Sequence, residues 1–192
     1  MVFPAFLKLE GKPVLIVGGG PVAASKVAAL QRAGARVRVV APDVCPDIER
    51  SVADIARRPF VPEDLDDVWF VVAAAPPEVN RAVSMEAASR RLFVNAVDDP
   101  SNATAYLGGV VRRGDATLAI STDGAAPALA GLLREALDAV LPDEDEMSAW
   151  FALAREQRVA WRALGTPMHE RRPQLLAALV ARYAAVAAGE SR

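Results

Sequence analysis

The sequence predicts an α/β fold in which helices cover a parallel β-sheet, followed by a C-terminal helical extension. Short apolar runs alternate with segments of helical spacing through residues 12–121. The run at 68–73 is apolar throughout, as in parallel strands that are covered on both faces. Apolar residues make up 53% of the chain and aromatic residues only 6%, a composition that favours helices packed closely on a sheet.

The strands and helices follow one another in a regular order. Strands are predicted over 12–17, 36–40, 55–57, 68–73, 92–96, 104–111 and 117–121. Helices are predicted over 22–32, 44–53, 77–90, from Pro127, over 143–164 and over 172–188. Gly34 follows the first helix and Pro77 opens the third, positions that favour these residue types. We expect 104–111 and 117–121 to be the last strands of the same sheet.

Charge and cysteine content narrow the choice of partners and compartment. The formal net charge is −2, so there is no broad basic field and we expect no nucleic acid partner. Cys45 is the only cysteine and cannot form an internal disulfide, which fits a reducing cytoplasm. Residues 1–9 are too short for a signal peptide, and no apolar stretch reaches the roughly 20 residues of a membrane span. The sequence therefore predicts a cytoplasmic protein that does not enter a membrane.

A glycine-rich turn stands between the first strand and the first helix. It comprises Gly18, Gly19, Gly20, Pro21, Val22 and Ala23 and matches the pattern G-x-G-x-x-G/A. Gly18 permits a tight turn, Gly20 lets the backbone approach a pyrophosphate, and Ala23 keeps the helix close to the sheet. In this setting the turn predicts a Rossmann-type domain that binds NAD, with Pro21 and Val22 also at the cofactor. The alternative is a turn of the same shape that binds no nucleotide.

An acidic residue beyond the second strand is the candidate partner of the adenosine ribose. Asp43 follows Pro42 about 20 residues after the glycine turn, where such a residue is usual. Both Pro42 and Asp43 are therefore assigned to the cofactor site. Asp43 could instead cap the next helix, since aspartate is a common N-cap residue. Arg36 and Arg38 leave an NADP 2′-phosphate site open, although we favour NAD.

Two polar segments follow predicted strands and are candidate ligand loops. Residues 98–103 are turn-prone and come directly after the strand at 92–96, where ligands bind in open parallel sheets. Residues 121–124 precede the helix at Pro127, and their amides and hydroxyls could hold a substrate carboxylate at the positive end of that helix. Helix capping is the alternative for this second segment.

The C-terminal extension carries one histidine and several arginines. His169 is expected at the surface near a turn, and not in catalysis. The basic side chains form either a solvated helix face or a surface for substrate carboxylates, and are Arg155, Arg158, Arg162, Arg171 and Arg172. Apolar side chains at helical spacing are expected to pack a core or a dimer, and are Trp150, Leu153, Trp161 and Leu164.

Three stretches together resemble one protein family. They are 3–23 with the glycine turn, 93–100 reading FVNAVDDP, and 118–133 reading LAISTDGAAPALAGLL. The chain resembles the precorrin-2 dehydrogenase family, the dehydrogenase and ferrochelatase module of siroheme synthases, in its stand-alone form. The resemblance implies NAD-dependent oxidation of precorrin-2 to sirohydrochlorin in siroheme biosynthesis. It also implies a homodimer and, as in some members, insertion of ferrous iron to give siroheme.

The resemblance also assigns residues. It implies that Asp98 is the catalytic base, assisted by Asp99 and Asn102. The other residues assigned to substrate binding are Asn95 and, from the segment before the helix at Pro127, Ser121, Thr122 and Gly124. There is no cluster of histidine and cysteine, so no resident metal is expected and the iron would be a substrate held by the tetrapyrrole.

The expected organisation is an NAD-binding domain over 1–112, a dimerisation and substrate region over 113–142 and a helical domain over 143–192. Two other functions remain open. One is a different NAD-linked oxidoreductase, although Tyr106 and Tyr183 lack the lysine four residues later that short-chain dehydrogenases use. The other is a non-enzymatic domain that senses NAD.

Overall fold

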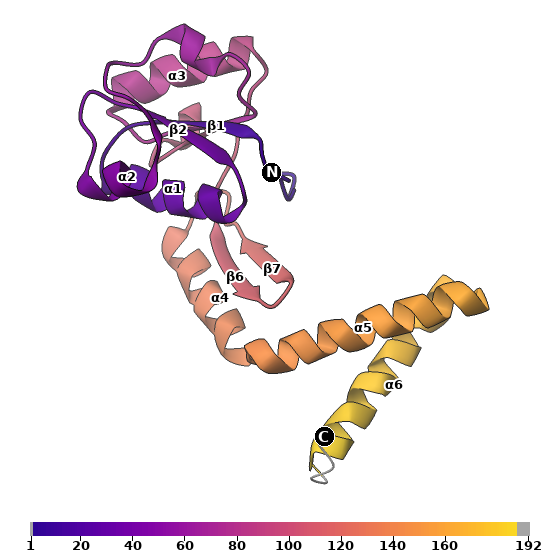
Figure 1. The fold of residues 1–192 in the computed structure, drawn as a ribbon. Helices are drawn as coiled ribbons and strands as arrows, with labels where there is room; N and C mark the ends of the chain where they lie inside the picture. Colours follow the sequence, from indigo (N-terminus) through magenta and orange to yellow (C-terminus); the bar gives the residue numbers. More distant parts are fainter. Residues whose placement is uncertain (1, 188–192) are drawn as a thin grey trace. The chain divides into compact units, whose positions relative to one another are not determined.

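The computed structural model describes residues 2–187, and the chain divides into two compact units (Figure 1). The first unit contains the residues up to 107 together with 123–125, and the second contains 108–122 and the residues from 126 onwards. The expected division at 112 and 142 stays a prediction.

A five-stranded parallel sheet forms the first unit. Its strands are β1 (Pro13–Val17), β2 (Arg36–Val40), β3 (Asp54–Ala56), β4 (Phe70–Ala73) and β5 (Val94–Ala96), in the spatial order β3-β2-β1-β4-β5. The chain builds outwards from β1 to β3, then crosses to β4 and continues to β5. The direction of winding therefore reverses between β1 and β4, which creates a crevice at the carboxyl ends of these strands.

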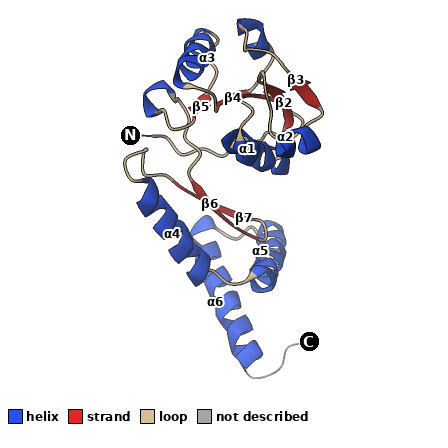
Figure 2. Cartoon of the chain, turned by 90° about the vertical axis from the view of Figure 1, so that its left-hand side faces the viewer, coloured by secondary structure: helices blue, strands red, loops and turns tan. Residues whose placement is uncertain are grey.

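Helices cover both faces of this sheet. They are α1 (Pro21–Arg32), α2 (Pro46–Ser51) and α3 (Pro77–Ser89), with 3-10 turns η1 (Pro62–Leu65) and η2 (Pro100–Asn102). α1 and α2 lie on one side and α3 on the other (Figure 2). A run of parallel strands between two helical layers has no solvated face, which explains why β4 is buried along its whole length.

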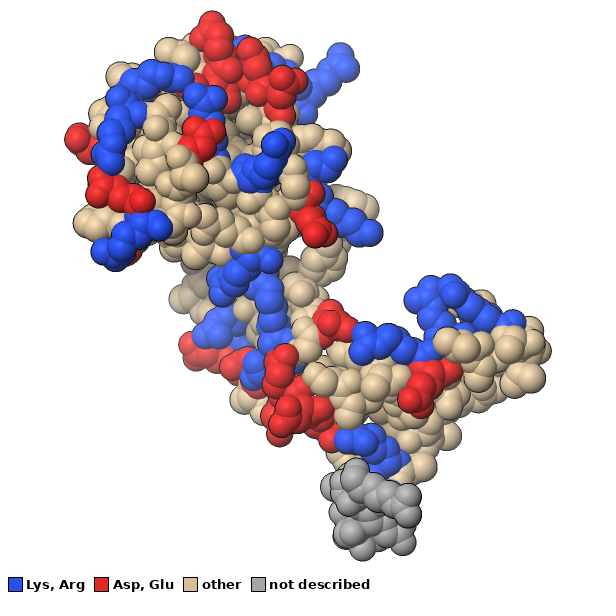
Figure 3. Space-filling model, in the orientation of Figure 1, with Lys and Arg blue, Asp and Glu red and all other residues tan. Residues whose placement is uncertain are grey.

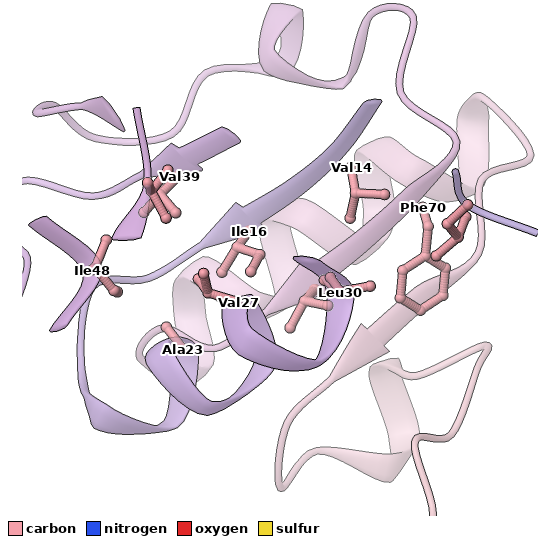
Figure 4. Close-up of a cluster of buried hydrophobic side chains, with 11 residues drawn as sticks. Val14, Ile16, Ala23, Val27, Leu30, Val39, Ile48 and Phe70 are labelled. Atoms are coloured by element: carbon pink, nitrogen blue, oxygen red, sulfur yellow. The ribbon is translucent and has the colours of Figure 1, made fainter. Parts of the chain in front are cut away.

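Alternate residues of each strand enter two separate cores. Val14 and Ile16 of β1 pack with Val27 of α1 and Ile48 of α2 (Figure 4). Leu15 and its neighbours of the same parity pack against α3 on the opposite face. Every second side chain of a strand packs against the apolar stripe of α1, and the side chains between them pack on the opposite face. Packing on both faces holds the strand ends in place.

Backbone hydrogen bonds extend the sheet beyond its strands at the carboxyl edge. The Gly18 N–H donates to Val40 O at 3.0 Å, the Ala74 N–H to Val17 O at 2.8 Å and the Val97 N–H to Ala73 O at 2.9 Å. The loops that follow β1, β2, β4 and β5 consequently leave the sheet at one level. Every loop that could contact a ligand at this edge starts from a fixed position.

The second unit contains a two-stranded antiparallel sheet and three helices. The strands are β6 (Gly109–Arg113) and β7 (Ala116–Ile120), and the helices are α4 (Pro127–Val140), α5 (Glu144–Leu164) and α6 (Met168–Ala187). Asp143 caps α5 by accepting the Glu146 N–H at 2.9 Å, and Gly165 ends it with φ +66°. No helix among residues 2–187 is both long and apolar enough to span a bilayer.

The α/β fold with a parallel sheet and a helical extension is confirmed, but two details differ from the sequence prediction. The expected strands at 104–111 and 117–121 do not continue the parallel sheet, because they pair only with each other and the first starts at Gly109. Thr104 and Ala105 instead both donate to Val94 O, at 2.9 Å each. The last helix starts at Met168 and not at 172, and its expected end at 188 lies outside the described residues.

Candidate active site

The three glycines after β1 serve different purposes. A Cβ on Gly18, whose φ is +127°, would overlap the Ala74 carbonyl oxygen, and one on Gly19 would overlap the Asp43 carbonyl oxygen. The fold itself therefore requires both glycines. A Cβ on Gly20 would meet no protein atom within 4 Å. The open space beside Gly20 is what a ligand approaching this backbone needs.

The start of α1 fits a bound diphosphate. Gly20 is its N-cap and supplies no side-chain hydrogen bond, Pro21 opens the helix, and the first turn carries no acidic residue. The first-turn amides thus have no side-chain cap, and the positive helix end faces no carboxylate of its own turn. Ala23 is fully buried against the sheet, as a small residue there allows. These features fit a dinucleotide cofactor at the glycine turn.

Asp43 lies beside the glycine turn and does not cap α2. The N-cap of α2 is Cys45, so the capping alternative for Asp43 is wrong. The Cys45 N–H donates to Gly19 O at 2.8 Å, which ties the loop after β2 to the glycine turn. Asp43 and Pro42 are both exposed. An exposed carboxylate at the end of β2 suits the ribose hydroxyls of a dinucleotide, and this role stays a prediction.

Arg38 faces carboxylates of its own chain. Its Nε lies 3.7 Å from Asp54 Oδ1, and a terminal nitrogen lies 3.7 Å from Asp64 Oδ1. The side chain of Asp64 is 1% exposed and accepts two hydrogen bonds from Arg58, at 2.8 and 2.6 Å. Burial alone would raise the pKa of Asp64, but the Arg58 guanidinium and the Val61 amide hold that pKa below its ordinary value. Arg38 thus belongs to an ion-pair cluster.

Arg36 stands at the opposite end of β2 from Asp43. It is the first residue of the strand, about 13 Å from its carboxyl end at the usual rise per residue. Of the two arginines that could have bound an NADP 2′-phosphate, Arg38 is therefore paired with carboxylates, and Arg36 is far from the loop where that phosphate would lie.

A cleft of about 520 Å³ opens at the carboxyl edge of the sheet, next to the glycine turn. Its walls come from three segments that are distant in the sequence: the start of α1, the loop after β4 with the first turn of α3, and the loop after β5. The lining residues are Val22, Ala74, Ala75, Pro77, Asn80, Val97, Asp98 and Asp99. The cleft thus brings Val22 of the predicted cofactor site together with the predicted catalytic and substrate residues Asp98 and Asp99.

Asp98 occupies the tip of the turn that follows β5. The Asp99 N–H donates to Ala96 O at 3.4 Å and closes this turn, in which Asp98 has φ +55°. A left-handed conformation is uncommon for a residue with a Cβ, although aspartate tolerates it better than most. Asp98 is exposed and lines the cleft. The backbone therefore holds this carboxylate, at some cost in strain, where a ligand can reach it.

Asp99 is fixed by its neighbours. Its carboxylate accepts hydrogen bonds from the Asn102 side chain at 2.7 Å and from the Ser101 hydroxyl at 2.8 Å. These bonds, that of Asn102 first, lower the pKa of Asp99, so this group stays ionised beside Asp98. Asn102 does not line the cleft itself, so it acts on the site only by its hydrogen bond to Asp99.

The remaining predicted substrate residues lie in different places. Asn95 is buried in β5, where its amide donates to Ala105 O at 3.0 Å, and it does not line the cleft. Gly124, with φ +75°, lies beside Tyr106 and Pro100 in the first unit. Ser121 and Thr122 belong to the second unit, where the Thr122 hydroxyl accepts the Ala126 N–H at 3.3 Å at the start of α4.

The C-terminal side chains pack or pair within the second unit. Trp161 is buried and donates to the Gln174 side chain at 2.6 Å, while Trp150 meets Tyr183 edge to face. Arg155 pairs with Asp115 at 2.7 Å, and His169 is exposed. On the face shown in Figure 3, basic and acidic side chains are interleaved on α5. This mixture fits the solvated-face alternative for the arginines.

Sequence reasoning missed three residues of structural weight. Gly19 stood inside the motif with no assigned role, and Asp64 and Asn80 were not singled out, although both are almost completely buried. A signal for Asn80 did exist. Asn80, Val83 and Ala87 share the spacing of the buried stripe of α3, so the asparagine interrupts an otherwise apolar stripe.

The sheet order, the reversal beside β1 and the glycine turn define a Rossmann-type dinucleotide-binding protein. Residues 5–109 match the family described as putative NAD(P)-binding, and the chain belongs to that family.

Individual proteins are also similar to this chain over most of its length. The chain is 41% identical over 174 residues to siroheme synthase 3 of Aeromonas hydrophila subsp. hydrophila, covering 88% of this chain and 37% of that protein. It is 40% identical over 164 residues to the siroheme synthase of Methylobacillus flagellatus, and the match covers 83% of this chain and 35% of that protein. The chain thus spans little more than a third of these relatives. The solved structure of SirC, precorrin-2 dehydrogenase, is similar with a TM-score of 0.70 and 29% identity, over 91% of this chain and 88% of that chain.

Proposed function

We propose that this protein is an NAD-dependent oxidoreductase that converts precorrin-2 to sirohydrochlorin in siroheme biosynthesis. The observation that carries the proposal is the position of Asp98. Its exposed carboxylate lines the same cleft as Val22, which belongs to the glycine turn. The similarity to siroheme synthases and to a precorrin-2 dehydrogenase supports the choice of substrate.

The cofactor site is built from the loops after β1 and β2. The first-turn amides of α1 hold the pyrophosphate beside Gly20, and Asp43 binds the adenosine ribose hydroxyls. NAD is preferred over NADP, because the carboxylate of Asp43 repels a 2′-phosphate and Arg38 is paired with Asp54 and Asp64. Bound NAD supplies the hydride acceptor for the oxidation.

Asp98 acts on the proton that leaves the macrocycle during the oxidation. Its carboxylate oxygen accepts this proton at the mouth of the cleft, where the exposed side chain can pass it on to water. Asp99 is held ionised by Asn102 and Ser101, and it lines the same cleft as a second carboxylate.

Iron insertion is a further step that the same carboxylate can assist, since pyrrole protons must leave when ferrous iron enters. In the described part of the chain no three histidine, cysteine, aspartate or glutamate side chains gather as metal ligands. In this step the iron is a substrate that the tetrapyrrole nitrogens hold.

The active form proposed here is a homodimer that pairs through α4. Within the described residues, α4 buries only Ala130. Four large apolar side chains of this helix are exposed, namely Leu129, Leu132, Leu133 and Val140. An apolar helix face of this kind is typical of an interface between subunits.

The test is an anaerobic assay with precorrin-2 and NAD that records NADH first and iron insertion second. We expect NADH formation by the wild type and a loss of about 10²- to 10⁴-fold in kcat for Asp98→Asn. Asp67→Asn is the matched control, because Asp67 is also exposed and left-handed (φ 60°) but does not line the cleft. A wild-type rate for Asp98→Asn refutes the role of Asp98. Binding of NAD without oxidation favours the sensor alternative.

A further inference from the structure

The wall of the cleft between β4 and α3 has no free backbone donor. The Ala74 N–H is used by Val17 O at 2.8 Å, and the Ala75 N–H donates to Asn80 Oδ1 at 3.0 Å. The next two residues, Pro76 and Pro77, have no N–H at all. The Asn80 N–H is also used, by Pro76 O at 3.0 Å, so among the residues that line this wall only a side chain can donate a hydrogen bond to a ligand.

Asn80 supplies that side chain. It is 3% exposed and lines the cleft. Because an amide N–H can only donate, the Asn80 atom that faces Ala75 must be the oxygen, and this fixes the orientation of the whole side-chain amide. The Nδ2 group consequently points away from Ala75.

The Nδ2 group has no partner in the described protein. No hydrogen bond from it is formed within residues 2–187. It is also not among the described side-chain atoms that are sealed from solvent without a hydrogen-bond partner, which are Arg38 Nε, Ser84 Oγ and Asn95 Oδ1. Asn80 therefore offers an oriented donor to the cleft on an almost completely buried side chain, a preorganised arrangement in which little rotamer entropy remains to be lost.

We propose that Asn80 is a binding residue for the nicotinamide-ribose half of NAD. Its Nδ2 donates to a ribose or carboxamide oxygen. Its Oδ1 accepts the Ala75 N–H and so fixes the backbone of the cleft wall beside it. This inference rests on the proposed function.

The order of the strands decides which half of the cofactor Asn80 meets. The adenosine half lies toward Asp43, after β2, and the loop after β4 lies on the opposite side of β1. Asn80 and Asp98 line the same cleft on that side. A donor there reaches the reacting half of the dinucleotide and not its adenosine half.

The test compares NAD with ADP, which contains the adenosine half alone, by calorimetric titration of the full chain. Asn80→Asp keeps an oxygen for the Ala75 N–H, but it replaces the Nδ2 donor with a second carboxylate oxygen and adds a negative charge, which the comparison with ADP controls for at the diphosphate. We expect its Kd for NAD to rise about tenfold, the value of one hydrogen bond, while its Kd for ADP changes less than about twofold. Asn80→Ala loses both bonds, so we expect weaker NAD binding and a lower unfolding temperature.

Ser84→Ala is the matched control, because Ser84 lies one turn further along α3, has a buried hydroxyl without a partner and does not line the cleft. We expect it to bind both ligands as the wild type does. Equal losses of NAD and ADP affinity in Asn80→Asp, or unchanged NAD affinity in that variant, overturn the inference. A wild type that binds NAD but does not oxidise precorrin-2 refutes the proposed function alone.

Discussion

The α-carbon of Gly19 lies so close to the carbonyl oxygen of Asp43 that no side chain fits between them. The neighbouring Cys45 N–H donates to Gly19 O at 2.8 Å, so the two loops also share a hydrogen bond. The turn proposed to bind the diphosphate and the carboxylate proposed to bind the ribose are therefore one rigid structure. A change at either loop is transmitted to the other.

Gly19→Ala and Gly20→Ala are expected to have different effects. The methyl group on Gly19 forces the Asp43 loop to move, so the free energy of unfolding falls by about 1–3 kcal/mol and NAD binding weakens. The methyl group on Gly20 meets no protein atom, so stability is unchanged while the Kd for NAD rises about tenfold or more. Denaturant unfolding and NAD titration measure both effects. Wild-type NAD affinity in Gly20→Ala would show that the dinucleotide does not approach there.

Asp64 is expected to make folding of the first unit sensitive to acid. Its folded pKa lies below the ordinary value of 3.8, because the hydrogen bonds from Arg58 and Val61 outweigh the opposing effect of burial. A depressed pKa means that the stabilisation is complete above about pH 4 and is lost as the pH falls through the folded value. We expect Asp64→Asn to lower the free energy of unfolding at pH 7 by about 2–3 kcal/mol and to flatten its fall in acid.

Urea unfolding between neutral and acid pH measures this effect. Asp54→Asn is the control, because Asp54 is exposed and only approaches Arg38 at 3.7 Å, so its loss costs at most about 0.5 kcal/mol. If Asp64→Asn keeps the stability of the wild type at pH 7, the cluster around Asp64 contributes nothing net.

Leu132→Glu is expected to dissociate the proposed dimer. Leu132 is 64% exposed on α4, and a carboxylate buried in an apolar interface has no partner there. Sedimentation equilibrium should give a dimer for the wild type and a monomer for the variant. Met85→Glu is the control, because Met85 is 65% exposed on a helix of the other unit and should leave the dimer intact. A monomeric wild type at micromolar concentration would contradict the α4 interface.

The strands of the parallel sheet could be predicted because their signal is local. β2 was predicted with its observed bounds, and β1 and β4 differ only at their first residues. The strand predicted over 104–111 is wrong in its first half. Thr104 and Tyr106 are residue types that favour strands, so the sequence before Gly109 resembles the start of a strand. The backbone there turns away from β5, with two N–H groups on one carbonyl, and this choice depends on long-range packing.

The positions of the glycine turn and of Asp98 could be predicted from local sequence, whereas the catalytic role of Asp98 came from the family resemblance and stays a prediction. The glycines stand between a strand and a helix, and Asp98 stands at the end of a strand, so their setting follows from neighbours in the sequence. Asn80 and Asp64 have no such setting. An asparagine in a helix and an aspartate before an apolar run are normally exposed, and only contacts with distant residues bury them here.

The sequence by itself determined that a parallel sheet with a dinucleotide turn would form, because strand and helix periods and the freedom of glycine are properties of short segments. The cleft was decided by tertiary structure. Val22, Asn80 and Asp98 come from three separate segments, and they meet because the strands before them pair in the order β1-β4-β5. That order is fixed by the burial of both sheet faces, which no single segment contains.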